Sequence, residues 1–273
     1  MDNNNQEPVF NSMFSFGENS SKKKKGHLEK HEKRRKNFLN EFDSDDLKRK
    51  REDKNISLRQ DKKKAMLNKR RMLGNQTNNI NEETKVQEKT YTISEAEGLY
   101  QDGMDIMEFF AILNKTEFHV QHFIDLIKLI YEKDDHKILF GIVGLRKLLS
   151  LIDKPPIQNV VDANLIPVLL TLASTSKVPR LRFEALWCLT NIASGSTDHV
   201  QALIDKGALQ VFVTMLLSDQ KNIVEQTIWA LGNIAGEDVY FRSLILKEGG
   251  LQPILVILSK VEPDTMICRN GAW

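Results

Sequence analysis

One short motif occurs twice, as Trp187-Cys188-Leu189-Thr190-Asn191-Ile192-Ala193 and, 42 residues later, as Trp229-Ala230-Leu231-Gly232-Asn233-Ile234-Ala235. In a helix that turns about 100° per residue, each copy places its leucine, isoleucine and final alanine on one broad apolar face. The tryptophan and the asparagine, four residues apart, then lie together on the opposite side. The motif therefore predicts two equivalent amphipathic helices, each with a Trp–Asn pair directed away from its own core.

The placement of the tryptophans favours a binding surface over ordinary packing. A lone tryptophan at helical spacing is usually buried, but all three tryptophans of this chain recur at one phase, since Trp273 follows Trp229 by 44 residues. Gln226 and Glu184 each stand three residues before a tryptophan and share its side of the helix. We call this predicted surface the Trp–Asn face and expect it to bind a ligand.

A second motif gives the period of the repeat. It reads Asp162-Ala163-Asn164-Leu165-Ile166, then Asp205-Lys206-Gly207-Ala208-Leu209, then Lys247-Glu248-Gly249-Gly250-Leu251, at spacings of 43 and 42 residues. These spacings indicate stacked helical repeats of the armadillo or HEAT size. Because each repeat buries its apolar face on its neighbours, we predict an all-α, right-handed solenoid with a concave surface. The glycines of this motif fit tight turns between helices.

Charge divides the chain into a basic arm and an acidic body. Residues 22–71 hold 21 Lys and Arg against 9 Asp and Glu, a net charge of +12, and the chain as a whole carries +2, so the remainder carries −10. Such blockwise asymmetry is typical of an interaction segment. Its partner could be nucleic acid, an acidic protein groove or the chain's own body.

Composition predicts four segments. Residues 1–26 are polar and lack an apolar run, so we expect a disordered tail. Residues 27–73 form the basic segment, with a long helix that begins near Ser44, where Asp45 and Asp46 favour a helix start, and ends near Gly74. Residues 74–117 contain a polar linker from Asn75 to Thr92 and then a short capping helix around 106–113. Residues 118–273 are the repeats, which open with helices at 121–131 and 136–151.

Several functional classes are excluded or disfavoured. Two cysteines provide no disulfide framework, and neither has the neighbours of a zinc site or an activated thiol. We expect no metal and no cofactor. No secretory signal and no stretch long enough to span a membrane is present, which predicts the cytosol or the nucleus.

The chain resembles the importin-α (karyopherin-α) family over roughly residues 30–273. The resemblance rests on the two W-x-L-x-N-I-A motifs, on residues 55–71, which are similar to the importin-β-binding segment, and on residues 264–273. The resemblance implies an array of ten armadillo repeats. This chain stops partway through the last helix of the fourth repeat. The resemblance also implies a nuclear-import adaptor that shuttles between cytoplasm and nucleus, with importin-β and cargo proteins as partners, and with neither membrane nor direct nucleic-acid binding.

The resemblance implies that a basic cargo peptide lies antiparallel along the concave face. Indole rings would flank Lys or Arg side chains, with about 0.5 to 2 kcal/mol per contact, and Asn amides would bind the peptide backbone. The implied cargo residues are Trp187, Asn191, Ser194, Gly195, Gln226, Trp229, Asn233, Glu237 and Trp273. In the first repeat, Val143 and Lys147 take the Trp and Asn positions, so the Trp–Asn face begins only at the second repeat.

The basic segment receives two implied roles, importin-β binding and autoinhibition by occupation of the cargo site. The residues implied are Lys48, Arg49, Lys50, Arg51, Arg59, Lys69, Arg70 and Arg71. Two positions of the lysine pocket depart from the family pattern. Glu237 stands where Asp is usual, and Val200 where Thr is usual, so a carboxylate is retained but a hydroxyl is lost.

Three alternatives remain open. A basic tail on a helical body is compatible with DNA or RNA binding, although the Trp–Asn face has no basic stripe. A general armadillo scaffold is a second alternative, for which paired Trp and Asn are not required. An enzyme is least favoured, because no nucleophile–base set or phosphate loop is present.

Overall fold

A computed structural model of the chain describes residues 90–101, 103–151, 153–262 and 265–272, with the isolated positions 54, 57, 61 and 65. The chain divides into two units, residues 1–55 and 56–273, and all helices named below belong to the second. The predicted tail, the eight basic residues assigned to importin-β binding and Trp273 lie outside the described residues. So does the predicted helix from Ser44 to Gly74, apart from the four isolated positions.

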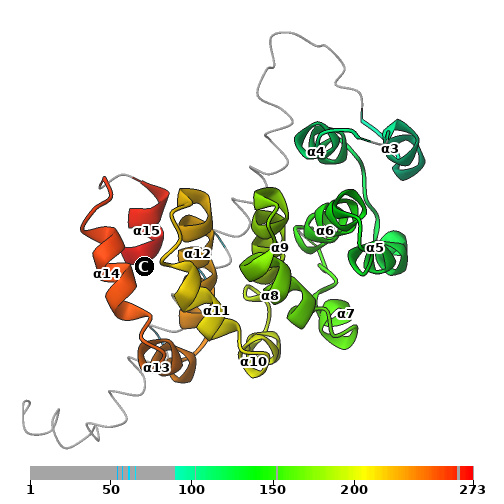
Figure 1. Ribbon diagram of the computed structural model, residues 1–273. Coiled ribbons are helices and arrows are strands. Elements are labelled where there is room, and N and C mark those ends of the chain that lie inside the picture. Colours follow the sequence, from blue (N-terminus) through cyan, green and yellow to red (C-terminus); the bar gives the residue numbers. More distant parts are fainter. Residues whose placement is uncertain are drawn as a thin grey trace, which may run out of the picture. The chain divides into compact units, whose positions relative to one another are not determined.

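The described residues from 90 onward are helical, with one isolated bridge between Tyr91 and Thr116 (Figure 1). The helices are α3 (Ile93–Leu99), α4 (Ile106–Asn114), the 3₁₀ helix η1 (Val120–His122), α5 (Phe123–Ile130), α6 (Asp135–Leu149), α7 (Ile157–Asp162), α8 (Ile166–Thr175), α9 (Pro179–Ile192), α10 (Thr197–Asp205), α11 (Ala208–Met215), α12 (Lys221–Glu237), α13 (Val239–Lys247), α14 (Leu251–Leu258) and α15 (Met266–Ala272). This confirms the predicted all-α class and both predicted helices after residue 118, the first of which begins as η1.

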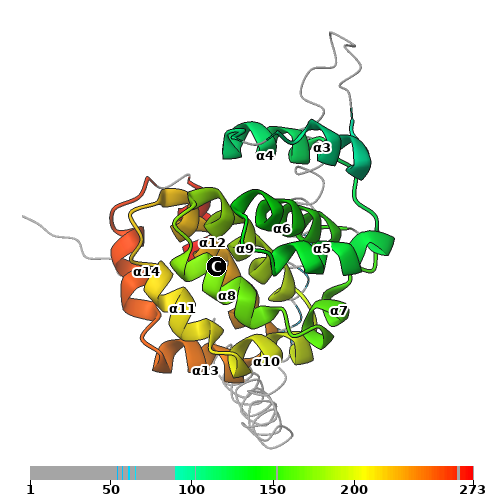
Figure 2. The same ribbon diagram turned by 45° about the vertical axis from the view of Figure 1, so that its right-hand side comes forward.

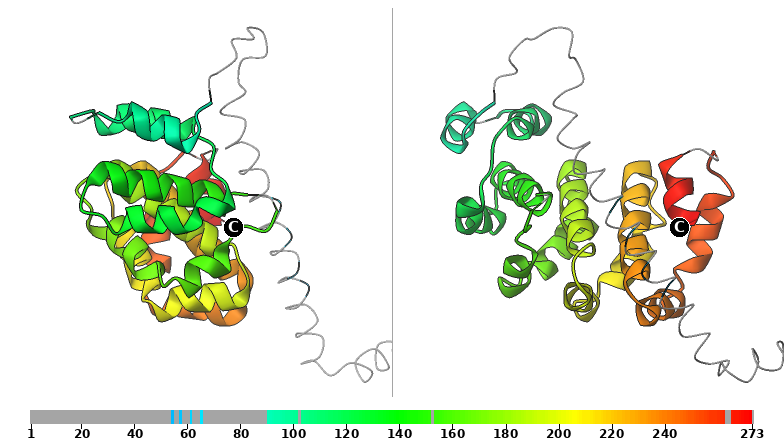
Figure 3. Two further views of the ribbon diagram at one scale, coloured as in Figure 1. Left: turned by 90° about the vertical axis from the view of Figure 1, so that its right-hand side faces the viewer. Right: turned by 180° about the vertical axis from the view of Figure 1, so that it is seen from behind.

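From α7 onward the helices come in sets of three. The third helices pack in succession, α6 against α9, α9 against α12, and α12 against α15, and the view from behind shows the last three side by side (Figure 3). The second helices α8 and α11 form the neighbouring layer (Figure 2). This stacking confirms the solenoid predicted from the 42- and 43-residue spacings.

The turn between the first and second helix of each repeat has the same backbone geometry. Asn164, Gly207 and Gly249 have φ values of 50°, 80° and 79°. Glycine adopts this left-handed region without steric cost, and asparagine is one of the few other residues found there. The predicted tight turns are therefore confirmed, and Asn164 takes the same role in the first of the three.

Two helices precede the repeats. The predicted amphipathic helix is α4, which buries Phe109 and Leu113. The sequence interpretation missed α3, which begins at Thr92 with a capping box, since the Thr92 side chain accepts from the Glu95 backbone and the Glu95 side chain accepts from the Thr92 backbone. The linker that the sequence predicts through Thr92 thus ends where this capping box starts a helix.

Candidate functional site

The first tryptophan of the Trp–Asn face lies at the centre of α9 and is partly exposed. The Arg146 guanidinium from α6 is positioned over its indole at 4.8 Å from the ring centroid. The Phe183 ring meets the indole edge-on at 5.8 Å. Trp187 is thus held by a cation on one helix and an aromatic ring one turn earlier on its own helix.

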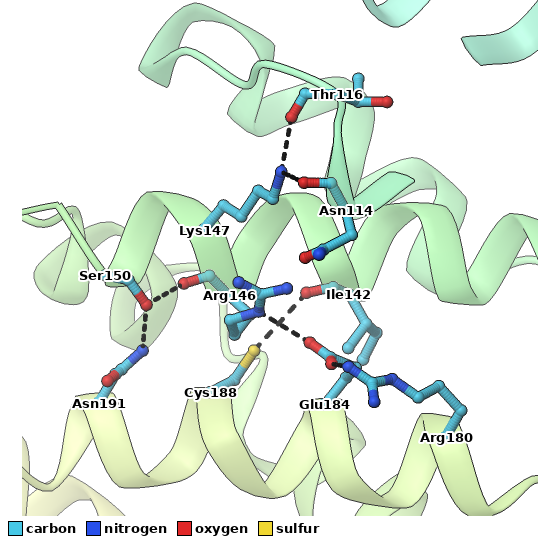
Figure 4. A network of polar contacts seen from close by, with 10 residues as sticks. All are labelled: Asn114, Thr116, Ile142, Arg146, Lys147, Ser150, Arg180, Glu184, Cys188 and Asn191. Atoms are coloured by element: carbon cyan, nitrogen blue, oxygen red, sulfur yellow. Dashed lines mark hydrogen bonds and ion pairs between the residues drawn. The ribbon is translucent and has the colours of Figure 1, made fainter. Parts of the chain in front are cut away.

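The asparagines do not lie on an open surface, which corrects the expectation drawn from the helical period. Asn191 and Asn233 are 2 % and 1 % exposed. The Asn191 amide donates to Ser150 Oγ at the end of α6 (3.0 Å, Figure 4), and the Asn233 amide donates to the Thr190 carbonyl of α9 (3.2 Å). Each third helix packs between two others, so the face opposite its own repeat core is largely covered as well.

The second copy of the motif is more enclosed than the first, because its tryptophan is buried whereas Trp187 is partly exposed. Gln226 and Trp229 on α12 are 3 % and 7 % exposed. The predicted apolar faces are buried as expected, with Leu189 and Ile234 fully buried. The sequence therefore predicted the core side of these helices correctly, but overestimated how much of the opposite side is open.

Glu184, interpreted from sequence as a polar group on the binding side, instead belongs to a buried ion-pair network. Its carboxylate accepts from Arg146 Nε at 2.8 Å and also pairs with Arg180 Nη2 (Figure 4). Glu184 is fully buried and Arg146 is 8 % exposed. The Arg180 guanidinium also stacks on Phe110 of α4, at 3.4 Å from the ring centroid. This network joins α4, α6 and α9, and its Arg146 guanidinium also contacts the Trp187 indole.

The first repeat lacks a Trp–Asn pair, as predicted. Val143 is fully buried. Lys147 Nζ donates to the carbonyls of Asn114 and Thr116, both at 2.7 Å (Figure 4). Burial, with a further contribution from the neighbouring Arg146, lowers the pKa of Lys147 to about 8. This lysine attaches the end of α4 to α6.

The small residues after α9 shape a helix start. Ser194 Oγ donates to the Asn191 carbonyl at 2.6 Å. The Ser196 backbone donates to His199 Nδ1 at 3.0 Å, so the ring carries its proton on Nε2, which lies 3.0 Å from Gln158 Oε1. Burial lowers the pKa of His199. A side chain at Gly195 would place Cβ only 2.4 Å from His199 Nδ1, so this imidazole requires the glycine.

The two candidate residues of the lysine pocket, Glu237 and Val200, lie at the end of α12 and in the first turn of α10. Glu237, the last residue of α12, is partly exposed, and its Oε1 accepts a hydrogen bond from Thr197 Oγ1 at 2.8 Å. Val200, one turn further along α10, is fully buried. Sequence reasoning did not select Thr197, because no local motif connects residues 40 positions apart.

Asn270 on α15 is a second residue that sequence reasoning did not assign. It is 3 % exposed, and within the described part of the chain neither its amide nitrogen nor its amide oxygen has a hydrogen-bond partner. A buried amide without partners is costly, which makes it a candidate for contact with a ligand. Its position three residues before Trp273 repeats the Gln226–Trp229 spacing, so the signal was present in the sequence.

The described residues contain no group of three or more His, Cys, Asp or Glu that could hold a metal ion. Burial raises the pKa of the Cys188 thiol well above its ordinary value. Across the same described stretches, no helix is both long and apolar enough to cross a membrane.

Comparison with known families gives two matches. The family described as Armadillo/beta-catenin-like repeat matches residues 153–194 and 196–236. The family described as Importin beta binding domain matches residues 34–121.

Among curated relatives, Importin subunit alpha-2 of Arabidopsis thaliana is 31 % identical over 244 residues, which are 89 % of this chain and 41 % of the relative. Importin subunit alpha-1b of Oryza sativa subsp. japonica is 36 % identical over 148 residues, which are 54 % of this chain and 28 % of the relative. The chain thus spans about two fifths of the length of the Arabidopsis relative and less of the rice relative.

Among solved structures, a designed armadillo repeat protein in complex with the peptide (KR)4 superposes with a TM-score of 0.53 at 23 % identity, covering 63 % of this chain and 76 % of that one. Fold and matches together define an armadillo-repeat protein that also has an importin-β-binding domain sequence. Over most of its length the chain is similar to relatives named importin subunit alpha, so it resembles the importin-α family in both its repeats and its importin-β-binding domain match.

Proposed function

We propose that this chain is a nuclear-import adaptor that binds basic nuclear-localisation peptides along α9, α12 and α15 and recruits importin-β through its basic segment. The observation that carries the proposal is the repeated Trp–Asn register on successive third helices, in a chain whose residues 34–121 match an importin-β-binding domain. This function implies shuttling between cytoplasm and nucleus, and it requires no catalytic group.

The chemistry of the face suits a basic extended peptide. The Trp187 indole is partly exposed, and the Arg146 guanidinium lies 4.8 Å from its ring centroid, so a cation can lie against this ring. The hydrogen bonds of Asn191 and Asn233 to neighbouring helices use the amide nitrogen, whereas a peptide N–H requires the amide oxygen. Asn270 adds an amide whose two polar atoms would gain partners.

A solved neighbour supports a basic ligand. The solved structure of the designed armadillo repeat protein is a complex with the peptide (KR)4, in which lysine and arginine alternate. Its likeness to this chain concerns the fold alone, but it demonstrates that an armadillo array can hold such a peptide. The residues assigned to this role here are the nine implied by the family resemblance, to which we add Asn270.

The adaptor and nucleic-acid hypotheses are separated by one set of titrations of the full chain. We expect a fluorescent lysine-rich peptide to bind and its alanine-substituted version not to bind, whereas a DNA duplex binds more weakly than the peptide. Tighter binding of the duplex, with no difference between the two peptides, would favour the nucleic-acid alternative.

The basic segment is proposed to bind importin-β through many distributed charges, including Lys48, Arg49, Lys50, Arg51 and Arg59. Contacts between exposed charges are screened by salt, with a Debye length of about 10 Å at 0.1 M ionic strength. The affinity of the full chain for importin-β should therefore decrease steeply between low and moderate salt. Salt-independent binding, or none, would contradict this role.

A further inference from the structure

The Thr197–Glu237 hydrogen bond connects the first and the last helix of one repeat, from the start of α10 to the end of α12. Thr197 is the first residue of α10 and is exposed, and Glu237 is the last residue of α12 and is partly exposed. Thr197 Oγ1 donates to Glu237 Oε1 at 2.8 Å across 40 residues of sequence. The pair thus lies on accessible surface rather than in the core.

This contact places a hydroxyl beside a carboxylate. Val200, three residues after Thr197 on α10, is buried and has no polar side-chain atom, so it cannot supply a hydroxyl. Thr197 donates its single hydroxyl proton to Glu237 and keeps lone pairs that accept from another donor. The hydrogen bond also restrains the glutamate, which has one more rotatable bond than an aspartate.

We propose that Thr197 completes the lysine pocket whose carboxylate is Glu237, as positioning residue for that carboxylate and as a second acceptor for the cargo lysine. This inference rests on the proposed peptide-binding function. An ammonium group has three donors on one nitrogen, so it bonds to a carboxylate oxygen and to a hydroxyl at once. A carboxylate that is already restrained loses less conformational entropy on binding.

Lysine is favoured over arginine at such a pair. A guanidinium binds a carboxylate best through two parallel bonds to its two oxygens. At Glu237 the Thr197 hydroxyl already donates to Oε1, so the two-pronged arrangement has to share that oxygen. The compact ammonium needs only one position near both acceptors.

The test uses the full chain, a lysine-rich peptide and its all-arginine counterpart. Thr197→Val keeps the side-chain shape but removes the hydroxyl, Thr197→Ser keeps the hydroxyl, and Glu237→Gln keeps the shape but removes the charge. We expect Thr197→Val to weaken lysine-peptide binding about fivefold to tenfold and arginine-peptide binding less than twofold, and Thr197→Ser to bind like the wild type. Combined with Glu237→Gln, Thr197→Val should cause a smaller additional loss than it does alone, because only the direct bond between the hydroxyl and the ammonium then remains to be lost.

The outcomes distinguish failure of the proposed function from failure of the role inferred for Thr197. If the wild-type chain binds neither peptide, the proposed function and this inference both fail. If the wild type binds and Thr197→Val leaves the lysine peptide unchanged, or weakens both peptides equally, only the lysine-reading role of Thr197 is overturned. Thermal melts of each variant exclude loss of fold as the cause of weaker binding.

Discussion

At the scale of single residues, the buried polar groups around α9 determine how Trp187 is presented. Glu184 is fully buried between Arg146 and Arg180, and Arg146 in turn covers the indole. Removing one partner from a buried ion pair leaves an uncompensated charge, which costs much more than the pair contributes over an apolar replacement. The network is therefore a sensitive point of the fold.

Glu184→Ala should destabilise the protein by about 3–5 kcal/mol, because two arginines lose their carboxylate partner. The free energy of unfolding from urea denaturation is the measurement. Glu132→Ala is the matched control, since this exposed glutamate should change stability by less than about 0.5 kcal/mol. Equal effects of the two substitutions would contradict the assigned role of the network.

His199 should make stability depend on pH. Burial lowers its pKa in the folded state below the ordinary 6.5, although Asp198 and Asp162 act in the opposite direction. Below about pH 6.5 the unfolded chain then binds more protons than the folded one, so stability decreases as the pH falls from 6.5 toward the folded-state pKa, and is constant above that window. Protonation of Nδ1 would also break its bond with the Ser196 backbone.

The variant His199→Gln does not titrate, so it should lose less stability than the wild type between pH 7.5 and pH 5.5. Urea denaturation at both pH values measures the difference. The other histidines contribute equally to both proteins. Parallel pH profiles of variant and wild type would show that His199 does not carry the effect.

At the scale of elements, the sequence correctly predicted the features that depend on one helix or one repeat, and it did not predict the packing between repeats. The period of residues 187–193 and 229–235 predicted which side faces the core of its own repeat, and the 42- and 43-residue spacings predicted the turns at Gly207 and Gly249. The period gave no information on packing between repeats, where helix axes approach to about 8–10 Å. For that reason the burial of Asn191 and Asn233 and the Glu184 ion pairs were not predicted.

The other contact that was not predicted joins residues that are far apart in the sequence. Thr197 and Glu237 meet only because α10 and α12 stack as they do. By contrast, the start of α3 could have been predicted, since Thr92 and Glu95 have the spacing of a capping box.

Lys147 is expected to hold helix α4 on the first repeat, through its bonds to the carbonyls of Asn114 and Thr116. Lys147→Met removes the ammonium group that donates both bonds, so amide hydrogen exchange should accelerate in residues 106–116 and remain unchanged in α12. Lys128→Met is the control, because Lys128 is exposed and pairs only with Asp125 among the described residues. Unchanged exchange in α4 would contradict this role.

At the scale of the whole molecule, the basic arm and the acidic body suggest competition between the protein's own sequence and its cargo. Lys69-Arg70-Arg71 is a short basic cluster of the kind that the Trp–Asn face is proposed to bind. Groups joined by a short flexible linker have millimolar effective concentrations for one another. We therefore propose that a weak contact within the chain competes with cargo and that importin-β relieves this competition by binding the basic segment.

Autoinhibition predicts that Lys69→Ala/Arg70→Ala/Arg71→Ala increases the affinity of the full chain for a lysine-rich peptide. Lys22→Ala/Lys23→Ala/Lys24→Ala removes the same charge from the tail and is the matched control, with no change expected. Fluorescence anisotropy compares the three proteins at one salt concentration. Identical affinities in all three would exclude autoinhibition by this cluster.

The most direct test of the central claim is the affinity of the full chain for a lysine-rich peptide with and without Trp187→Ala/Trp229→Ala. Two lost cation–indole contacts of about 0.5 to 2 kcal/mol each should weaken binding at least about fivefold. Tyr240→Ala, which removes an exposed aromatic side chain from α13, should leave the affinity unchanged. An unaltered titration in the double tryptophan variant, with its fold intact by circular dichroism, would contradict the assignment of the Trp–Asn face as the cargo site.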